Sequence, residues 1–135
     1  MTNTPVEKAF TIDTSSIKFG PGITNEAGFE LSRLAAKRVM VVTDRKMADS
    51  HAVKSATESL RREGIDHTIF DQVSVEPTDD SLKKAISFAV EGRFDGFLPV
   101  GGGSSIDTAK AANLYSTYPG DFLEYVNAPI GKGTP

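Results

Sequence analysis

Three consecutive glycines and a serine stand between an apolar run and a segment with helical periodicity: Gly101, Gly102, Gly103 and Ser104. Glycines let the backbone turn sharply and let a ligand approach the peptide plane without meeting a Cβ atom. The first N–H groups of the expected helix, at Ser104, Ser105 and Ile106, lie at the positive end of its dipole and suit an anion such as a diphosphate. A tight turn alone needs only one glycine, so the run of three favours a phosphate-binding loop.

Two aspartates could complete such a site. Asp44 directly follows another apolar run, and its carboxylate could bind both hydroxyls of an adenosine ribose while repelling a 2′-phosphate, which favours NAD over NADP. A turn aspartate that caps the next helix is the alternative. Asp107 lies three residues after Ser104, a spacing that also permits a capping box. Asp44 precedes the glycines by 101 − 44 = 57 residues, whereas the common Rossmann fingerprint has its acid about 20 residues after them. The pattern therefore indicates a different dinucleotide fold.

Composition excludes several classes of protein. The 135 residues carry 15 Lys and Arg against 18 Asp and Glu, a net charge of −3, and show no basic stripe, so we expect no nucleic-acid partner. The absence of cysteine excludes disulfides, thiolate metal sites and a cysteine nucleophile. His51 and His67 do not have a metal-ligand spacing.

The longest aliphatic run, at 39–42, is far shorter than the roughly 20 residues that a bilayer requires. We therefore expect no membrane association. The first ten residues lack the apolar core of a signal peptide and the arginines of a transit peptide. These features predict a cytoplasmic protein, or a protein of the mitochondrial matrix if it is eukaryotic and processed.

The elements that must position these residues alternate along the chain. Apolar runs predict strands over 38–43, 67–73 and 96–100, and helical periodicity predicts helices over 24–36, 51–63, 78–90 and 104–116. Residues 9–19 alternate around a Thr-Ser-Ser turn, which predicts an N-terminal β-hairpin or a bent edge strand. Strands that alternate with helices of this length predict an α/β fold, with a Rossmann-like, mostly parallel sheet flanked by helices. Ligands of such sheets bind beyond the carboxyl ends of the strands, where the glycines and Asp44 fall.

Caps and apolar faces define the expected helices. Thr24 is the expected N-cap of the first helix, whose inner face would include Leu34. Gly64 stands at the C′ position after the second helix. The third helix would bury a face that extends to Val90.

The run PVGGGSSIDTAKAANLY resembles the glycine signature of the iron-containing, or group III, alcohol dehydrogenase superfamily. The segment Val42-Thr43-Asp44 is similar to the superfamily's ribose-binding segment. The stretches IKFGPGIT, VEPTDDS and DFLEYVNAPIGKGTP further resemble the N-terminal half of one branch, the hydroxyacid-oxoacid transhydrogenases. The resemblance covers residues 9–135. One departure is Glu76-Pro77-Thr78, where many members of the superfamily carry Asn-Pro-Thr.

The resemblance implies roles for the candidate residues. Asp44 would bind the adenosine ribose of NAD, and Asp107 would lie near the nicotinamide end. The pyrophosphate would be bound by the glycine loop, which consists of Gly101, Gly102, Gly103 and Ser104. The expected organisation is a flexible N-terminus over 1–8, a dinucleotide-binding domain over 9–127 and the start of an interdomain linker over 128–135.

The family's helical domain, which holds a divalent metal (iron or zinc), is absent from this chain, so no catalytic or metal-binding residue is expected within it. The complete enzyme would transfer hydride between a hydroxyacid or alcohol and an oxoacid or aldehyde. We expect a small-molecule substrate and either a homo-oligomer or association with the missing helical domain, and the chain alone would not be catalytic. The alternatives are an NAD-dependent alcohol or polyol dehydrogenase of the same superfamily, and a stand-alone nucleotide-binding module.

Overall fold

The central strand β1 (Arg38–Val42) is almost entirely apolar, and all but its first residue are completely buried. The computed structural model describes residues 13–135. In them, β1 pairs in parallel with β2 (Asp66–Phe70) on one side and with β3 (Gly96–Pro99) on the other. Because successive side chains of a strand point to opposite faces, such an apolar run requires cover on both faces. The predicted parallel sheet is confirmed.

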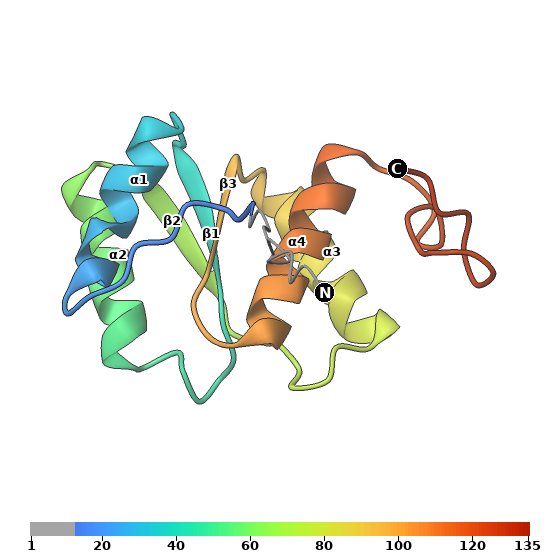
Figure 1. The fold of residues 1–135 in the computed structure, drawn as a ribbon, viewed down its shortest axis with the longest axis horizontal. Helices are drawn as coiled ribbons and strands as arrows, with labels where there is room; N and C mark the ends of the chain where they lie inside the picture. Colours follow the sequence, from blue (N-terminus) through green and yellow to red (C-terminus); the bar gives the residue numbers. More distant parts are fainter. Residues whose placement is uncertain (1–12) are drawn as a thin grey trace, which may run out of the picture.

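Helices cover both faces of this sheet (Figure 1). The chain places α1 (Ala27–Arg33), which follows the 3-10 turn η1 (Ile23–Glu26), and α2 (His51–Arg62) on one face. The other face is covered by α3 (Asp79–Gly92) and α4 (Gly103–Thr117). The α/β class and the alternation of elements are as predicted from the sequence.

The sheet divides the apolar core into two clusters. On the α3–α4 side, Met40 and Val42 of β1 pack with Phe70 of β2 and with four small helical residues: Ala85, Ala89, Ala109 and Ala112. On the α1–α2 side, the cluster is formed by Val39, Val41, Leu31, Ala36, Leu60 and Ile65. The alanines let α3 and α4 approach the sheet and each other closely. Among the described residues, no helix is both long enough and apolar enough to cross a bilayer.

The order of the strands, β2-β1-β3, creates a topological switch point. The chain leaves β1 through α2 to reach β2 on one side, and α3 then carries it back across the sheet to β3 on the other side. Where neighbouring strands send their connections in opposite directions, their carboxyl ends leave a crevice between the loops. This crevice lies between the ends of β1 and β3.

The boundaries of most elements lie close to the predicted ones. Ser50 caps α2 through a hydrogen bond from the Val53 amide (3.2 Å), and Gly64 adopts the left-handed conformation (φ 68°) expected of a C′ glycine. Thr78 begins α3 with a capping box that involves Ser81. The inner face of α3 is narrower than predicted, because Val90 is 52% exposed.

The first helix differs most from its prediction. Thr24 is not its N-cap, because the 3-10 turn begins one residue earlier and is preceded by Gly22. The helix ends at Arg33, since Ala35 adopts a left-handed conformation (φ 60°) and the Ala36 amide donates to the Leu31 carbonyl (3.1 Å). The reversal turns Leu34 away from the core, so this residue is 78% exposed instead of buried.

The hairpin predicted over 9–19 begins outside the described residues, and residues 13–19 form no strand. An isolated pair of strands is marginal unless it buries an apolar face. Here Ile17 and Phe19 are 77% and 99% exposed. The segment is instead joined to the first helical turns by ion pairs from Lys18 to Glu26 and Glu30.

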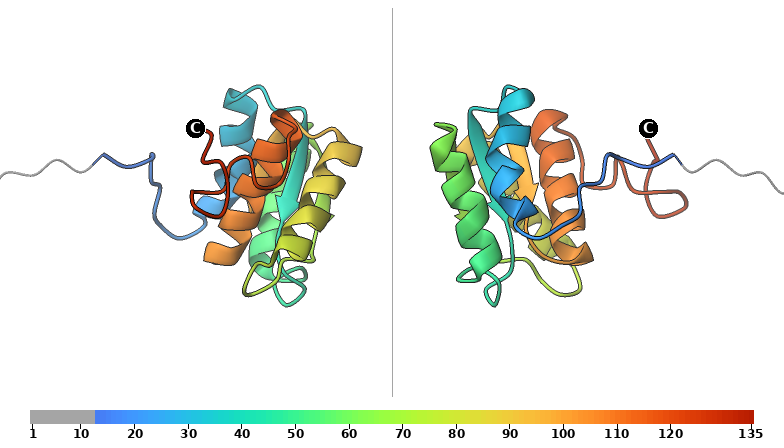
Figure 2. Two further views of the ribbon diagram at one scale, coloured as in Figure 1. Left: turned by 90° about the vertical axis from the view of Figure 1, so that its right-hand side faces the viewer. Right: turned by 60° about the vertical axis from the view of Figure 1, so that its left-hand side comes forward.

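The residues after α4 close into a loop that projects beyond this helix (Figures 1 and 2). Glu124 accepts hydrogen bonds from Lys132 Nζ (2.8 Å) and Thr134 Oγ1 (2.7 Å), and the bond from Lys132 lowers the pKa of the Glu124 carboxyl. Tyr115 of α4 stacks on Phe122 with ring centroids 5.5 Å apart. The loop is therefore held by its own ends and attached to α4 through aromatic contact.

A close approach between α1 and α2 requires one glycine. A Cβ atom on Gly28 would lie 2.2 Å from the backbone oxygen of Ser59. The Ser59 hydroxyl accepts a hydrogen bond from the Gly28 amide (2.8 Å) and donates one to the Asn25 carbonyl (2.6 Å). The contact thus satisfies buried polar groups where the two helices touch.

We predict that Gly28→Ala destabilises the protein. The new methyl group would collide with the backbone of Ser59, which cannot move aside as the end of a flexible side chain can. The expected loss in free energy of unfolding is about 1–3 kcal/mol. Gly120→Ala is the matched control, since its Cβ would meet only Glu124 side-chain atoms at an ordinary 3.8 Å. Denaturant unfolding measures both variants, and equal stability of the two would contradict the described packing.

Candidate functional site

Buried Thr43 joins the carboxyl ends of all three strands. Its amide donates to the Phe70 carbonyl (2.9 Å), and its carbonyl accepts from the Val73 amide (3.2 Å). Its hydroxyl donates to the Val100 carbonyl (2.7 Å). These bonds fix the loops that follow the strands relative to one another, so Asp44 has a defined position beside both.

The structure brings Asp44 and the glycine loop to the same edge of the sheet. Val42 and Pro99 are register partners in neighbouring parallel strands. Asp44 and Gly101 each follow their registered residue by two positions. The shared edge is as predicted, and the strand order further places the two on opposite sides of the crevice at the switch point.

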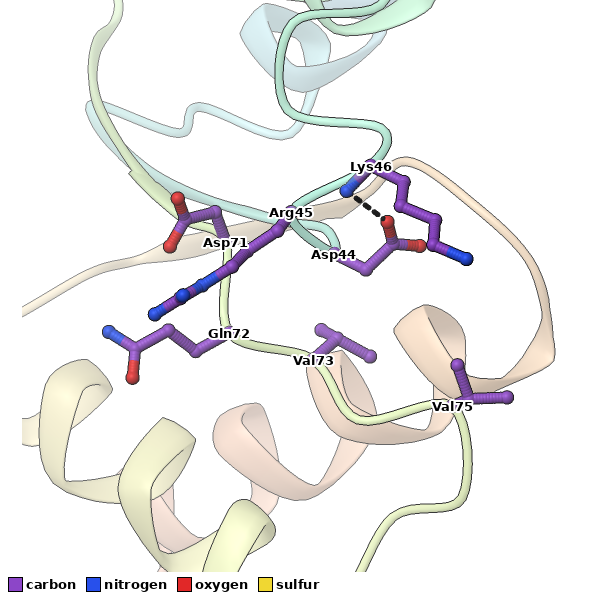
Figure 3. A pocket seen from close by; sticks show the side chains of 7 residues that line it. All are labelled: Asp44, Arg45, Lys46, Asp71, Gln72, Val73 and Val75. Atoms are coloured by element: carbon purple, nitrogen blue, oxygen red, sulfur yellow. Dashed lines mark hydrogen bonds between the residues drawn. The ribbon is translucent and has the colours of Figure 1, made fainter.

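Asp44 holds a turn with only one of its carboxylate oxygens. Oδ1 accepts from the amides of Lys46 (2.8 Å) and Met47 (2.9 Å), and the first of these bonds is drawn in Figure 3. Asp44 does not cap α2, whose N-cap is Ser50. Oδ2 has no hydrogen bond among the described residues, so one oxygen remains available to a ligand.

Only the first glycine of the loop is required by the fold of the chain. Gly101 has a φ of +151°, and a Cβ atom there would lie 2.6 Å from Ser105 Oγ. Gly102 and Gly103 have no such constraint, because a Cβ atom on either would meet nothing within 4 Å. The space above these two residues is open, which is the geometry that a closely approaching ligand needs.

The amides at the start of α4 are arranged differently from the prediction. The helix begins with Gly102 as N-cap, and the Ser105 and Ile106 amides donate to the Gly102 carbonyl (3.1 and 3.2 Å). The sequence had indicated that the Ser105 and Ile106 amides are available to an anion. This was wrong, because both are used within the helix. Within the described chain, the amides of Gly103 and Ser104 have no acceptor. They lie at the positive end of a helix of 15 residues.

The capping box that the spacing of Ser104 and Asp107 permits does not form, because the N-cap of α4 is Gly102, two residues before Ser104. The Ser104 hydroxyl instead donates to the Val75 carbonyl, which ties α4 to the loop after β2. Asp107 is exposed and its side chain has no hydrogen bond to any described residue. It is therefore not needed as a cap.

A pocket of about 370 Å³ opens beside Asp44 at the ends of β1 and β2 (Figure 3). Seven residues line it: Asp44, Arg45, Lys46, Asp71, Gln72, Val73 and Val75. All but Asp44 are missing from the sequence-based site. Arg45, Lys46 and Val75 come shortly after the predicted strands 38–43 and 67–73, where ligands of a parallel sheet bind. Asp71, Gln72 and Val73 were instead placed inside the predicted strand 67–73, which was too long, because β2 ends at Phe70.

Neither histidine belongs to a cluster of potential metal ligands in the part of the chain that the structure describes. His51 Nε2 lies 3.3 Å from Ser55 Oγ on the same helix. Within residues 13–135 there is no group of three or more His, Cys, Asp or Glu residues arranged to hold a metal ion.

Comparison with known proteins adds an independent finding. A family model described as iron-containing alcohol dehydrogenase matches residues 14–135. The mitochondrial hydroxyacid-oxoacid transhydrogenase of Bos taurus is 52% identical over 128 residues, which cover 94% of this chain and 28% of the relative. The human mitochondrial hydroxyacid-oxoacid transhydrogenase is 48% identical over 128 residues, covering 94% of this chain and 27% of the relative. The chain thus spans little more than a quarter of the length of these relatives.

Solved structures agree with the sequence comparison. A 1,3-propanediol oxidoreductase is 30% identical with a TM-score of 0.75, over 80% of this chain and 28% of that chain. NADH-dependent butanol dehydrogenase A of Thermotoga maritima is 25% identical with a TM-score of 0.76, over 85% of this chain and 29% of that chain. The extent of the family match and the shared α/β architecture lead to one conclusion: the chain belongs to the iron-containing alcohol dehydrogenase family.

Proposed function

We propose that this chain is the NAD(H)-binding part of a metal-dependent oxidoreductase that transfers hydride between a hydroxyacid or alcohol and an oxoacid or aldehyde. The observation that carries the proposal is the pair Gly102 and Gly103. The fold has room for a side chain at both positions, so it does not explain why both residues are glycine. In addition, the amides of Gly103 and Ser104 lack acceptors among the described residues. A dinucleotide pyrophosphate accounts for both facts.

Each proposed ligand residue has a separate task. Gly101 makes the turn, and the amides of Gly103 and Ser104 donate to the pyrophosphate across the surface that Gly102 leaves open. The free Oδ2 of Asp44 accepts from the ribose hydroxyls, which favours NAD over NADP. Asp107, exposed on the second turn of α4, faces the nicotinamide end. The residues present therefore fit the cofactor.

The chemistry itself needs parts beyond these residues. A nicotinamide cofactor accepts and returns a hydride, and a divalent metal, iron or zinc, polarises the substrate oxygen in such enzymes. We propose that the metal ligands lie in the remainder of the complete enzyme. The role of the present chain is to bind and orient the cofactor.

The surroundings of the complete enzyme are also proposals. Phe19 and Leu34 are large apolar side chains that are exposed. We propose that a helical domain or a second copy of the chain covers them in the complete enzyme. The curated relatives are named as mitochondrial proteins. For this protein we propose the cytoplasm, or the mitochondrial matrix of a eukaryotic cell.

Among the hydride-transfer reactions, we propose transhydrogenation. The support is that the bovine and human hydroxyacid-oxoacid transhydrogenases share about half of their aligned residues with this chain. The solved alcohol dehydrogenase structures support a second candidate, an NAD-dependent alcohol or polyol dehydrogenase. The two differ in whether the cofactor leaves the enzyme between the oxidation and the reduction.

An isotope experiment on the full-length enzyme separates the two reactions. A hydroxyacid, 4-hydroxybutyrate, carries deuterium on its hydroxyl-bearing carbon, and 2-oxoglutarate is supplied with no added NAD. A transhydrogenase moves the deuteride to the carbonyl carbon of the oxoacid, and the donor becomes an aldehyde. Mass spectrometry then finds deuterated 2-hydroxyglutarate. Label transfer that depends on added NAD would favour the dehydrogenase.

We predict that Gly102→Ala weakens NADH binding by about tenfold or more, or about 1.4 kcal/mol, because the new methyl group occupies the space of the pyrophosphate. Its free energy of unfolding should change by less than about 0.5 kcal/mol, since the Cβ meets no atom of the chain. Fluorescence titration and denaturant unfolding measure the two quantities. Unchanged NADH affinity would contradict the proposed cradle, and Gly120→Ala is the control.

We predict that Asp44→Asn weakens NADH binding by roughly 10-fold while the turn is retained. Asparagine keeps the Oδ1 acceptor for the Lys46 and Met47 amides. It removes the charge, and hydrogen bonds to charged groups contribute about 1.5–3 kcal/mol against about 1 kcal/mol for neutral ones. Asp49→Asn, an exposed aspartate outside the pocket, is the matched control. Equal affinities of both variants and the wild type would exclude a ribose role for Asp44.

A further inference from the structure

Two cationic side chains directly follow the aspartate to which the ribose is assigned. Arg45 and Lys46 line the same pocket as Asp44. We propose that these two cations form a latent subsite for a 2′-phosphate and set the affinity of the pocket for NADP(H). The carboxylate of Asp44, to which the ribose is assigned, opposes them. The proposal rests on the proposed function, because it concerns the same dinucleotide site.

The turn after β1 holds both cations at the mouth of the pocket. The Lys46 and Met47 amides donate to Asp44 Oδ1, and the Ala48 amide donates to the Asp44 carbonyl (3.0 Å). The backbone of Arg45 and Lys46 is thus fixed by the aspartate itself. Figure 3 shows Arg45 extending toward Asp71 and Gln72, whereas Lys46 extends on the other side, near the Asp44 carboxylate.

Neither cation is committed to a partner within the described part of the chain. No ion pair within 4.0 Å involves Arg45 or Lys46, although two carboxylates, Asp44 and Asp71, line the same pocket. Both side chains are exposed. The adenosine of NAD has no charge for them to bind, whereas the phosphate of NADP has two. A guanidinium binds phosphate through two parallel hydrogen bonds, and an ammonium binds it as a point charge.

The balance of charge explains why a single residue would decide the preference. The carboxylate of Asp44 repels a 2′-phosphate, and Arg45 and Lys46 attract it. With Asp44 charged, the two effects oppose each other and NAD is preferred by a limited margin. With Asp44 neutral, Asp71 is the one carboxylate left in the pocket lining, and the two cations outnumber it. A dinucleotide site without these cations would lose the repulsion of the phosphate along with the aspartate but would gain no attraction for it.

The test compares NADPH with NADH affinity by fluorescence titration of the full chain, after removal of any cofactor that co-purifies. Removing both cations in Arg45→Gln/Lys46→Gln should lower the ratio of NADPH to NADH affinity by about tenfold or more. Asp44→Asn should raise this ratio, and the triple variant that combines all three changes should not. The control Arg61→Gln/Arg93→Gln removes the same charge at the opposite edge of the sheet and should leave the ratio unchanged.

Two results would overturn the proposal. One is an affinity ratio that is the same in Asp44→Asn and in the triple variant, which would show that Arg45 and Lys46 are solvated surface cations. The other is an equal fall in the control variant, which would show general attraction. Failure of the wild-type chain to bind NADH is a different result, because it contradicts the proposed function itself.

Discussion

The arrangement depends on the hydrogen bonds of Thr43 at the carboxyl end of the central strand. Its amide and carbonyl pair with the chain at and after β2, and its hydroxyl reaches the Val100 carbonyl after β3. Because this residue is fully buried, water cannot replace these partners, and loss of any of them leaves a costly unpaired polar group. The loops that follow the three strands are therefore positioned relative to one another by one residue of the core. Asp44 and the glycine loop take their relative positions from it.

Given that frame, the glycine loop divides into a structural and a ligand-facing part. Gly101 adopts the backbone conformation that the turn needs. Gly102 and Gly103 face open space, beside amides that have no acceptor among residues 13–135. Asp44 shows the same division within one side chain, since Oδ1 holds the turn and Oδ2 is left over. A site built in this way is rigid before its ligand arrives, which reduces the ordering cost of binding.

The sequence was informative where residue type alone determines structure. The apolar run 38–43 predicted a strand buried on both faces, which is β1. The Gly-Gly-Gly-Ser run predicted a tight turn from strand to helix, which joins β3 to α4. The sequence was uninformative where contacts between distant parts of the chain determine the structure. The apolar period continues through Leu34, but a left-handed Ala35 ends the helix before it. The pocket walls from Asp71 and Gln72 depend on the strand order β2-β1-β3, which local patterns do not encode.

The central claim is that the amides at the start of α4 and the free oxygen of Asp44 together hold a dinucleotide. A crystal structure of the full-length protein with NADH tests it most directly. We expect the pyrophosphate within hydrogen-bond distance of the Gly103 and Ser104 amides, and a ribose hydroxyl on Asp44 Oδ2. A cofactor bound away from this crevice, or a pyrophosphate that leaves both amides without an acceptor, would contradict the account.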